Sequence, residues 1–512
     1  MLVKTYASAV FGIDAAIITI EVNVSKGINF FLVGLPDNAV KESKQRMESA
    51  IKTLGYHWPG KRIVINMAPA DVRKEGSAYD LPLAIGILAA SEQVKSDRFT
   101  DYILMGELSL DGTLHPVKGV LPIAIEARKN GFKGFILPKQ NASEAAVVDK
   151  LDVYGVETLT DVVNFFNEEK ELELTYVDTR NEFFSNLDNY DVDLADVKGQ
   201  ENVKRALEVA AAGGHNIIMV GPPGAGKTML AKRIGTIIPP LTLHEALETT
   251  KIHSVSGLLD SHHGLITQRP FRSPHHTTSD IALVGGGSYP QPGEISLAHN
   301  GVLFLDELPE FKRTVLEVLR QPLEDRHITI SRSKYTIDYP ASFMLVASMN
   351  PCPCGYYNHP EKECVCTPGV VQKYLNRISG PLLDRIDIHI EVVPVPFRKL
   401  TEARVSESSH DIRGRVTKAR KIQEERFKDH AGIHCNAQMG ASLLQKICVI
   451  DDEGISLLKN AMERLGLSAR AYDRILKVSR TIADMEESPD IKSTHLAEAI
   501  QYRSLDRENW AG

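Results

Sequence analysis

Eight consecutive residues constrain this chain more than any other feature: residues 221–228 read Gly-Pro-Pro-Gly-Ala-Gly-Lys-Thr. This pattern is typical of a phosphate-binding loop, in which backbone N–H groups surround a triphosphate, a lysine contacts its β- and γ-phosphates and a threonine hydroxyl binds Mg²⁺. Residues 215–220 are predicted to form a strand and residues 229–238 a helix. This context argues against the alternative, a Gly-rich turn without a ligand. The predicted nucleotide-binding residues are Gly221, Pro222, Pro223, Gly224, Ala225, Gly226, Lys227 and Thr228.

An apolar segment that ends in two acids follows the loop: Leu303-Phe304-Leu305-Asp306-Glu307. We predict that Asp306, with Thr228, holds Mg²⁺ and that Glu307 polarises the water that attacks the γ-phosphate. A further strand, predicted at residues 343–348, leads to Asn350, which can orient this water. The alternative is that Asn350 caps a turn at the end of its strand. The two motifs together predict hydrolysis of a nucleoside triphosphate.

Two arginines are candidates for contacting the phosphates. Arg385 precedes a strand predicted at residues 386–393, and an arginine presented to a neighbouring subunit stabilises the charge of phosphoryl transfer. A surface salt bridge to Asp384 or Asp387 is the alternative for Arg385. Arg470 opens a predicted helix and, taken alone, is typical of a solvated helix residue.

The length and composition bound the remaining possibilities. The chain has 512 residues, enough for three domains, and its formal net charge of −7 excludes a globally basic surface. The N-terminus lacks the order of a signal peptide, and no apolar run approaches the length of about 18 residues that spans a membrane. Six cysteines, four of them clustered, do not resemble a disulfide scaffold. These features predict a soluble protein of a reducing compartment, the cytoplasm.

The pattern of elements predicts four segments: a first domain at residues 1–168, an acidic linker at 169–196, the nucleotide domain at 197–395 and a helical domain at 396–512. Predicted strands lie at residues 16–24, 30–33 and 62–67, and predicted helices at 37–54, 81–90, 201–212, 452–465 and 469–484.

A long polar segment separates the two phosphate motifs. Lys227 and Asp306 are 306 − 227 = 79 positions apart, too far for one strand–helix–strand step with connections of about 2–6 residues. Residues 256–292 are rich in Gly, His and Pro, which excludes them from a core. We expect either a disordered excursion or a functional loop.

Five motifs occur in an order that resembles one known family: the phosphate loop, GVLFLDEL, SMNPCPCG, SGPLLDRID and LSARAYDRILKVSRTIAD. They resemble the magnesium-chelatase-like AAA+ ATPases of the ComM/YifB group. FRSPHHTTSDIALVGGG and PGEISLAHNGVLFLDEL are particularly specific to that group. The resemblance spans nearly the whole chain.

The resemblance implies a multidomain α/β fold. It comprises a Lon-protease-like α+β N-terminal domain, a P-loop AAA+ α/β core with a helix-2 insert, and an α-helical C-terminal lid. Asn350 matches sensor 1, Arg385 the arginine finger and Arg470 sensor 2 of such ATPases. Residues 256–292 would contain the helix-2 insert, which in related ring motors points into the central pore.

The resemblance also implies a function. Family members are hexameric, and ComM-type proteins are DNA helicases that drive branch migration during homologous recombination, including natural transformation. We therefore expect a homo-hexameric motor that uses ATP and Mg²⁺ on single-stranded or branched DNA, with recombination proteins as partners and without a membrane. A metal-chelatase motor and a nucleotide-switched DNA-binding scaffold are the alternatives. The N-terminal domain argues against the first, because chelatase motors are expected to lack it, and the intact phosphate motifs argue against the second.

The Lon resemblance raises the question of proteolysis, which needs a serine activated by a lysine. Ala78 aligns with the nucleophile position, or Ser77 if the alignment has a gap of one residue. The lysine position falls near Leu121, with Lys118 three residues early. We therefore predict a domain without proteolytic activity that acts as a scaffold or a DNA-contacting collar.

Four cysteines directly follow the predicted sensor: Cys352, Cys354, Cys364 and Cys366. Four thiolates can bind Zn²⁺ tetrahedrally and order a loop that has little apolar content. The alternative is four reduced thiols, with His359 unrelated to them.

DNA contact is predicted for the polar insert rather than for the lid. Arg269 and Arg272, beside His275 and His276, would be repeated around a ring and would contact phosphates without reading sequence. We expect the two histidines to be pore-loop residues rather than a metal pair. The basic residues between 413 and 426 are predicted to form a solvated lid helix, with a subunit or DNA contact as the alternative.

Overall fold

The computed structural model describes residues 2–185, 190–259, 264–287, 290–332, 335–357, 359, 361–396 and 406–503. Parts of the predicted insert (260–263 and 288–289) and of the predicted lid (397–405 and 504–512) lie outside the described residues. The chain forms two compact units. Unit 1 comprises Met1–Leu187 and Thr242–Thr267, and unit 2 comprises Asp188–Leu241 and Gln268–Gly512. Within the described ranges, no helix has the length and apolar character that crossing a membrane requires.

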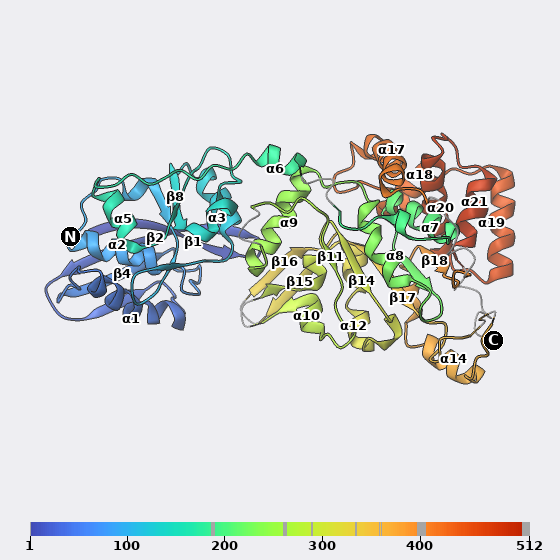
Figure 1. Cartoon of the computed structure of the whole chain (residues 1–512), viewed down its shortest axis with the longest axis horizontal. Coiled ribbons are helices and arrows are strands. Elements are labelled where there is room, and N and C mark those ends of the chain that lie inside the picture. The colour runs from blue at the N-terminus through green and yellow to red at the C-terminus, as the bar shows by residue number, and fades with distance from the viewer. Residues whose placement is uncertain are drawn as a thin grey trace. The chain divides into compact units, whose positions relative to one another are not determined.

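A seven-stranded mixed sheet with the order β3-β4-β2-β1-β5-β8-β9 forms the centre of unit 1 (Figure 1). Its strands are β1 (Leu2–Phe11), β2 (Asp14–Ser25), β3 (Phe30–Val33), β4 (Arg62–Ala68), β5 (Tyr102–Leu104), β8 (Gly134–Pro138) and β9 (Asp152–Val156), and a separate pair is formed by β6 (Glu107–Leu108) and β7 (Leu114–His115). Its helices include α1 (Asn38–Thr53), α2 (Asp80–Ala90), α3 (Val120–Lys129), α4 (Ala142–Ala145), α5 (Leu159–Phe166) and α6 (Thr179–Ser185). All eleven residues of α2 are buried, as its continuous apolar sequence predicts.

One helix of unit 1, α9 (Leu243–Ser256), comes from inside the predicted nucleotide domain. The carbonyl oxygen of Ser254 accepts a hydrogen bond from the Gly119 N–H (3.0 Å), and the Ser254 hydroxyl donates to the buried carboxylate of Glu144. The sequence analysis did not predict this helix. The predicted division at residues 168 and 197 therefore differs from the compact units, because 242–267 groups with the N-terminal residues.

The predicted linker, residues 169–196, also has structure in its described part. The Thr175 N–H donates to the Val153 carbonyl of β9 (2.8 Å), and α6 follows. The first half of the linker thus packs with unit 1, which its acidic composition alone did not indicate.

A five-stranded parallel sheet with the order β11-β14-β17-β10-β18 forms the centre of unit 2 (Figure 1). Its strands are β10 (Ile217–Val220), β11 (Phe271–Arg272), β14 (Val302–Leu305), β17 (Met344–Met349) and β18 (Ile388–Glu391). Helices near it are α7 (Glu201–Gly213), α8 (Lys227–Arg233), α10 (Asp280–Val284), α11 (Glu294–Leu297), α12 (Arg313–Glu317), α13 (Arg320–Asp325), α14 (Pro368–Leu375) and α15 (Gly380–Leu383). The strands predicted around both phosphate motifs are confirmed, with ends that differ by at most two residues.

The polar segment at 256–292 contributes to this sheet, so the prediction that it lies outside the core is wrong in part. Phe271 pairs with Val302 at the sheet edge, and Leu283 of α10 is fully buried. Two hairpins are additional to the sheet: β12 (Gly285–Gly286) with β13 (Gln291–Pro292), between α10 and α11, and β15 (His327–Arg332) with β16 (Tyr335–Pro340). The excursion that interrupts the core is therefore shorter than the sequence indicated.

The C-terminal part of unit 2 is helical, as predicted (Figure 1). Its helices are α17 (Ser409–Phe427), α18 (Ala441–Ile447), α19 (Asp452–Leu465), α20 (Ala469–Met485) and α21 (Ser493–Gln501). α19 has the predicted bounds, because its apolar residues recur with helical spacing between the cap Asp451 and the left-handed Gly466.

A buried carboxylate joins these helices. Asp484 is 1% exposed and accepts hydrogen bonds from Arg426 Nη1 (2.7 Å), Arg480 Nε (3.0 Å) and Asn436 Nδ2 (2.8 Å). Two guanidinium groups inside the domain therefore share one carboxylate, whose hydrogen bonds offset the cost of burying its charge.

The Asp484→Ala variant should be destabilised by about 3–5 kcal/mol, because two largely buried cations lose their common counter-charge. Calorimetry of the full chain should show a lower midpoint for the transition of unit 2. Asp490→Ala, which changes an exposed carboxylate five residues after the end of α20, is the matched control. An unchanged midpoint for Asp484→Ala would show that this network does not hold the helices together.

Candidate active site

Three parallel strands end at one edge of the sheet of unit 2, and a predicted site residue follows each of them. β17 pairs with both β10 and β14, so the three are neighbours. Their carboxyl ends lead to Gly221, Asp306 and Asn350. Ligands of open α/β sheets bind outside the carboxyl ends of the strands. The topology therefore brings together residues that are 129 positions apart in the sequence (350 − 221).

The phosphate loop turns sharply between β10 and α8, and its glycines permit the turn. Gly224 and Gly226 have φ angles of 78° and 90°, a region that glycine adopts without the steric penalty of a side chain. A Cβ atom at Gly221 would lie 2.2 Å from the carbonyl oxygen of Val392. The glycine spacing in the sequence thus reflects the path of the backbone.

Lys227 lies between this loop and the end of β17. Its Nζ donates to the carbonyl oxygens of Gly221 (2.7 Å) and Pro222 (3.0 Å) and to Oδ1 of Asn350 (3.1 Å). Burial lowers the pKa of Lys227, and the two acids after β14 oppose that shift. The Asn350 side chain therefore faces the loop, which favours the predicted site residue over a turn cap.

Asp306 is held by three donors. Its Oδ2 accepts a hydrogen bond from Thr228 Oγ1 (2.8 Å), and its Oδ1 accepts from Ser348 Oγ and from the Glu307 N–H (3.1 Å). The two residues predicted to share Mg²⁺ are thus in contact, and hydroxyl and carboxylate oxygens are the ligands that Mg²⁺ prefers. The sequence analysis did not identify Ser348, which lies in a strand that looked wholly structural.

Glu307 has an unusual backbone and an unexpected neighbour. Its φ is 53°, a left-handed conformation that is rare for residues other than glycine and that clusters at active sites. Its carboxylate is half exposed, and its Oε2 lies 3.8 Å from Nδ1 of His276. His276 therefore lies beside a predicted catalytic residue, and its place in a pore loop stays a prediction. Nδ1 of His275 lies 2.9 Å from Thr277 Oγ1.

Arg385, together with Arg470, lies toward the amino ends of the parallel strands, whereas the phosphate loop follows their carboxyl ends. Arg385 comes three residues before β18, and its carbonyl accepts from Asn216 Nδ2 (3.2 Å) just before β10 begins. The five residues from Asn216 to the loop span roughly 16 Å of extended chain. Within one chain, neither arginine contacts the loop among the described residues.

Both arginines have partners of their own. Arg385 pairs with Glu324 (2.6 Å) and donates to the Pro381 carbonyl (2.6 Å), and its side chain is only 8% exposed. The predicted alternative, a bridge to Asp384 or Asp387, is therefore wrong. Arg470 instead lies 3.5 Å from Asp384, so the two arginines flank the same short segment.

Arg269 and Arg272 are used inside unit 2, which contradicts their prediction as DNA ligands on a loop. Arg269 donates to the carbonyls of Pro239 (2.6 Å) and Asn300 (2.7 Å). Arg272 forms two hydrogen bonds with the carboxylate of Glu294 (2.7 and 2.8 Å). These contacts join segments of the fold, and Arg272 itself belongs to β11.

The basic lid helix α17 is also largely engaged. Arg415 pairs with Glu208 and Glu407, Arg420 donates to the Ala211 carbonyl (2.8 Å), and Arg426 pairs with the buried Asp484 described above. These contacts support the interpretation of α17 as a lid helix rather than a phosphate-binding surface.

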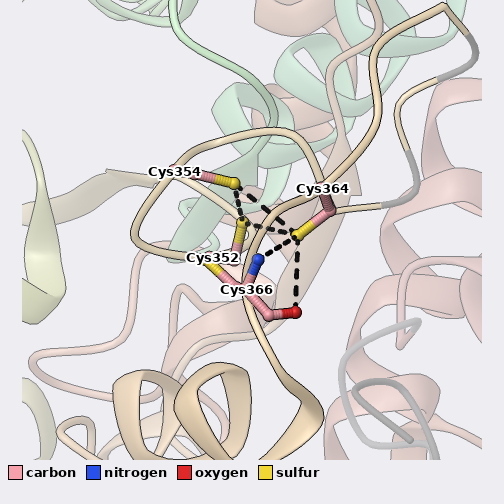
Figure 2. A group of neighbouring side chains, drawn as sticks. All are labelled: Cys352, Cys354, Cys364 and Cys366. Atoms are coloured by element: carbon pink, nitrogen blue, oxygen red, sulfur yellow. Dashed lines mark hydrogen bonds between the residues drawn. The ribbon is translucent and has the colours of Figure 1, made fainter.

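The four predicted zinc ligands lie together. One sulfur from each of Cys352, Cys354, Cys364 and Cys366 lies within 4.8 Å of all the others (Figure 2). His359 is separate, because its Nδ1 accepts hydrogen bonds from the backbone of Glu361 and Lys362.

In unit 1, the residues considered for a proteolytic pair have other partners. The Ser77 hydroxyl donates to Glu107, and Ala78 contributes only its carbonyl, to Gly106 N–H (2.8 Å). The side chain of Lys118 packs at Gly257. Among the described residues no serine–lysine hydrogen bond forms here.

Three family descriptions match successive parts of the chain. Residues 193–400 match the family described as magnesium chelatase, subunit ChlI. Residues 20–141 match the family described as subunit ChlI of Mg-chelatase, and residues 406–503 match the C-terminal region of that subunit. The matches cover the N-terminal part, the nucleotide-binding part and the helical C-terminal part.

Two bacterial proteins resemble the chain over nearly its whole length. It is 46% identical over 505 residues to competence protein ComM of Haemophilus influenzae, which covers 98% of this chain and 97% of that protein. It is 45% identical over 504 residues to YifB of Salmonella typhimurium, with the same coverage. A shorter match, 31% identical over 155 residues, is to Lon protease 2 of Bacillus subtilis and covers 28% of this chain and 27% of the protease.

Proposed function

Because the chain belongs to the ComM/YifB family of magnesium-chelatase ChlI-like proteins, we propose that this AAA ATPase is a DNA motor that remodels recombination intermediates as a ring of six identical subunits. The near full-length match to a competence protein carries the proposal. The assembled phosphate loop, acid pair and asparagine support it, because they supply the groups that ATP turnover needs.

The proposed roles follow from the contacts. Lys227 binds the β- and γ-phosphates, in place of its present acceptors on the loop. Thr228 and Asp306, already in contact, bind Mg²⁺. Glu307 polarises the attacking water, and Asn350 orients it as sensor 1.

We propose that Arg385 and Arg470 act on the nucleotide of a neighbouring subunit. Both lie at the edge of the sheet away from their own phosphate loop, so neither can serve it without a large rearrangement. Arg385 must exchange Glu324 for a phosphate, which is a stronger partner for a guanidinium group. An arginine supplied in trans makes hydrolysis depend on the ring.

For unit 1 we propose a Lon-like domain that has lost proteolytic activity and serves as a scaffold or a DNA contact. The partial match to Lon protease 2 supports the fold, and the hydrogen bond of Ser77 to Glu107 supports the loss of activity. A serine whose neighbour is a carboxylate rather than a lysine lacks the usual activating base.

ATPase activity measured with and without single-stranded, duplex and four-way DNA tests the proposed function. We expect stimulation by single-stranded or four-way DNA that falls steeply with salt, because chains of net charge −7 attract DNA only through local contacts. A junction-migration assay follows the movement directly, and Lys227→Ala protein controls for contaminating ATPases. An ATP turnover rate that no DNA changes, together with no migration of four-way junctions, would contradict the proposal of a DNA motor. DNA binding without any phosphate release would indicate a scaffold.

A metal-chelatase motor is the second candidate, because all three family descriptions name that enzyme. The expected argument against it, that chelatase motors lack the N-terminal domain, does not hold here, since residues 20–141 also match a chelatase description. A porphyrin-insertion assay with candidate partner subunits discriminates the two. Mg²⁺ insertion without DNA stimulation would favour the chelatase.

A further inference from the structure

The four clustered cysteines have the spacing of metal ligands rather than of a disulfide. Sγ of Cys352 lies 3.3 Å from that of Cys354 and 3.7 Å from that of Cys364, and the last two are 3.6 Å apart. Zinc–sulfur bonds of about 2.3 Å in a tetrahedron place the sulfurs roughly 3.8 Å apart, whereas a disulfide bond is about 2.05 Å long. Figure 2 shows the sulfurs of Cys352, Cys354 and Cys364 facing one another.

The loop that carries them has little else to order it. Its described residues between β17 and α14 form neither helix nor strand, and the local core consists of the buried Cys352 and Val371 with a few partly buried neighbours. The Cys366 N–H donates to the Cys364 sulfur (3.4 Å), a contact that stabilises a thiolate. A loop with so small a core gains its order from a cross-link or a metal.

The same loop contacts the phosphate loop. Cys352 follows Asn350 by two residues. Gly355, which has a φ of 83°, lies so close to Pro223 that an added Cβ would be 2.5 Å from its Cδ atom. The cysteine loop therefore packs directly on the segment that binds the phosphates.

Helix α14, where this loop ends, reaches the second phosphate motif. Arg377, two residues after α14, donates through Nη1 to Oε2 of Glu310 (3.0 Å) and to the Pro309 carbonyl (3.3 Å), three and two residues after Glu307. The cluster thus lies within the segment that connects Asn350, the phosphate loop and the residues after Glu307.

We propose that the four cysteines bind one thiophilic metal ion, of which Zn²⁺ is the best fit, and that this ion holds the cysteine loop against Pro223 so that Asn350 keeps its position. Four thiols lose their protons on binding, and the ion gains four thiolate ligands without any redox change. The metal is structural, because all four positions of the tetrahedron are filled by protein. This inference does not depend on whether the motor acts on DNA.

Elemental analysis of full-length protein purified without chelator tests the site. We expect about one zinc per chain in the wild type and almost none in a Cys364→Ser/Cys366→Ser variant. Cys448→Ala, which changes a buried cysteine outside the cluster, should keep its zinc. Wild-type protein that has no bound metal and four freely reactive thiols in this loop would overturn the assignment.

Hydrogen exchange of the full chain tests whether the metal holds the cysteine loop against the phosphate loop. Removal of zinc in excess Mg²⁺ should speed amide exchange in residues 351–357 and in the phosphate loop, and zinc but not Mg²⁺ should reverse the change. Turnover should fall roughly 10- to 100-fold, as expected when catalytic groups shift by about 1 Å. Faster amide exchange in residues 351–357, with an unchanged exchange rate in the phosphate loop, would show that the metal does not hold the two loops together.

Discussion

Glu307→Gln protein should bind ATP with nearly wild-type affinity and hydrolyse it at least about 100-fold more slowly. The substitution keeps the size of the side chain and leaves Asp306 and Thr228 in contact, so the proposed Mg²⁺ site remains. It removes the carboxylate that polarises water, and a positioned base contributes a factor of about 10²–10⁴. Because bound ATP is then not consumed, the ring should also be stabilised.

Phosphate release and binding of a fluorescent ATP analogue separate the two effects. Lys227→Ala is the matched control, because it removes a phosphate ligand and should weaken binding itself. Wild-type turnover by Glu307→Gln protein would overthrow the assignment of Glu307, and Asp306 would become the residue to examine.

Arg385→Ala protein should lose ATP turnover by about 1,000-fold, the lower end of what an arginine supplied to the transferring phosphate contributes. Mixing it with Glu307→Gln protein should restore part of the activity. In a mixed ring, an Arg385→Ala subunit supplies an intact Glu307, and its Glu307→Gln neighbour supplies the arginine. Neither protein has such a site alone.

Arg385 is nearly buried, so its variant needs a folding control. Melting curves show whether Arg385→Ala protein remains folded, and Glu324→Gln, which releases the arginine from its ion pair, should retain activity. Arg320→Ala changes an arginine with an ion pair of its own and should be neutral. A fully active Arg385→Ala ring, or mixed rings that stay inactive, would remove the trans role.

The local sequence predicted which residues of the phosphate loop, the acid pair and the strand end at Asn350 come together, because this geometry depends on short motifs. The glycines of the loop are required by the backbone path, and the acid pair follows directly from a buried strand. Strongly periodic helices such as α19 were predicted to the residue, since apolar spacing and capping residues agree there. Both kinds of signal lie within one continuous segment.

Contacts between distant segments were not predictable in this way. β11 has only two residues, too few for any periodicity, so its arginine looked like part of a polar loop. The ion pair of Arg272 with Glu294 and the approach of Gly355 to Pro223 depend on how the chain folds back. The proximity of His276 to Glu307 could not be predicted for the same reason.

Because helix α9 belongs to unit 1 but lies between two parts of unit 2 in the sequence, one truncation of the chain cannot separate the two units. The chain crosses between them at three places, after residues 187, 241 and 267, so no single breakpoint in the gene divides one unit from the other. A fragment that starts at the nucleotide domain would retain α9 but lose its partners, exposing the buried Ala246, Ile252 and Val255 to water. A fragment that contains unit 2 alone therefore requires a second deletion, of residues 242–267, together with a new connection between residues 241 and 268.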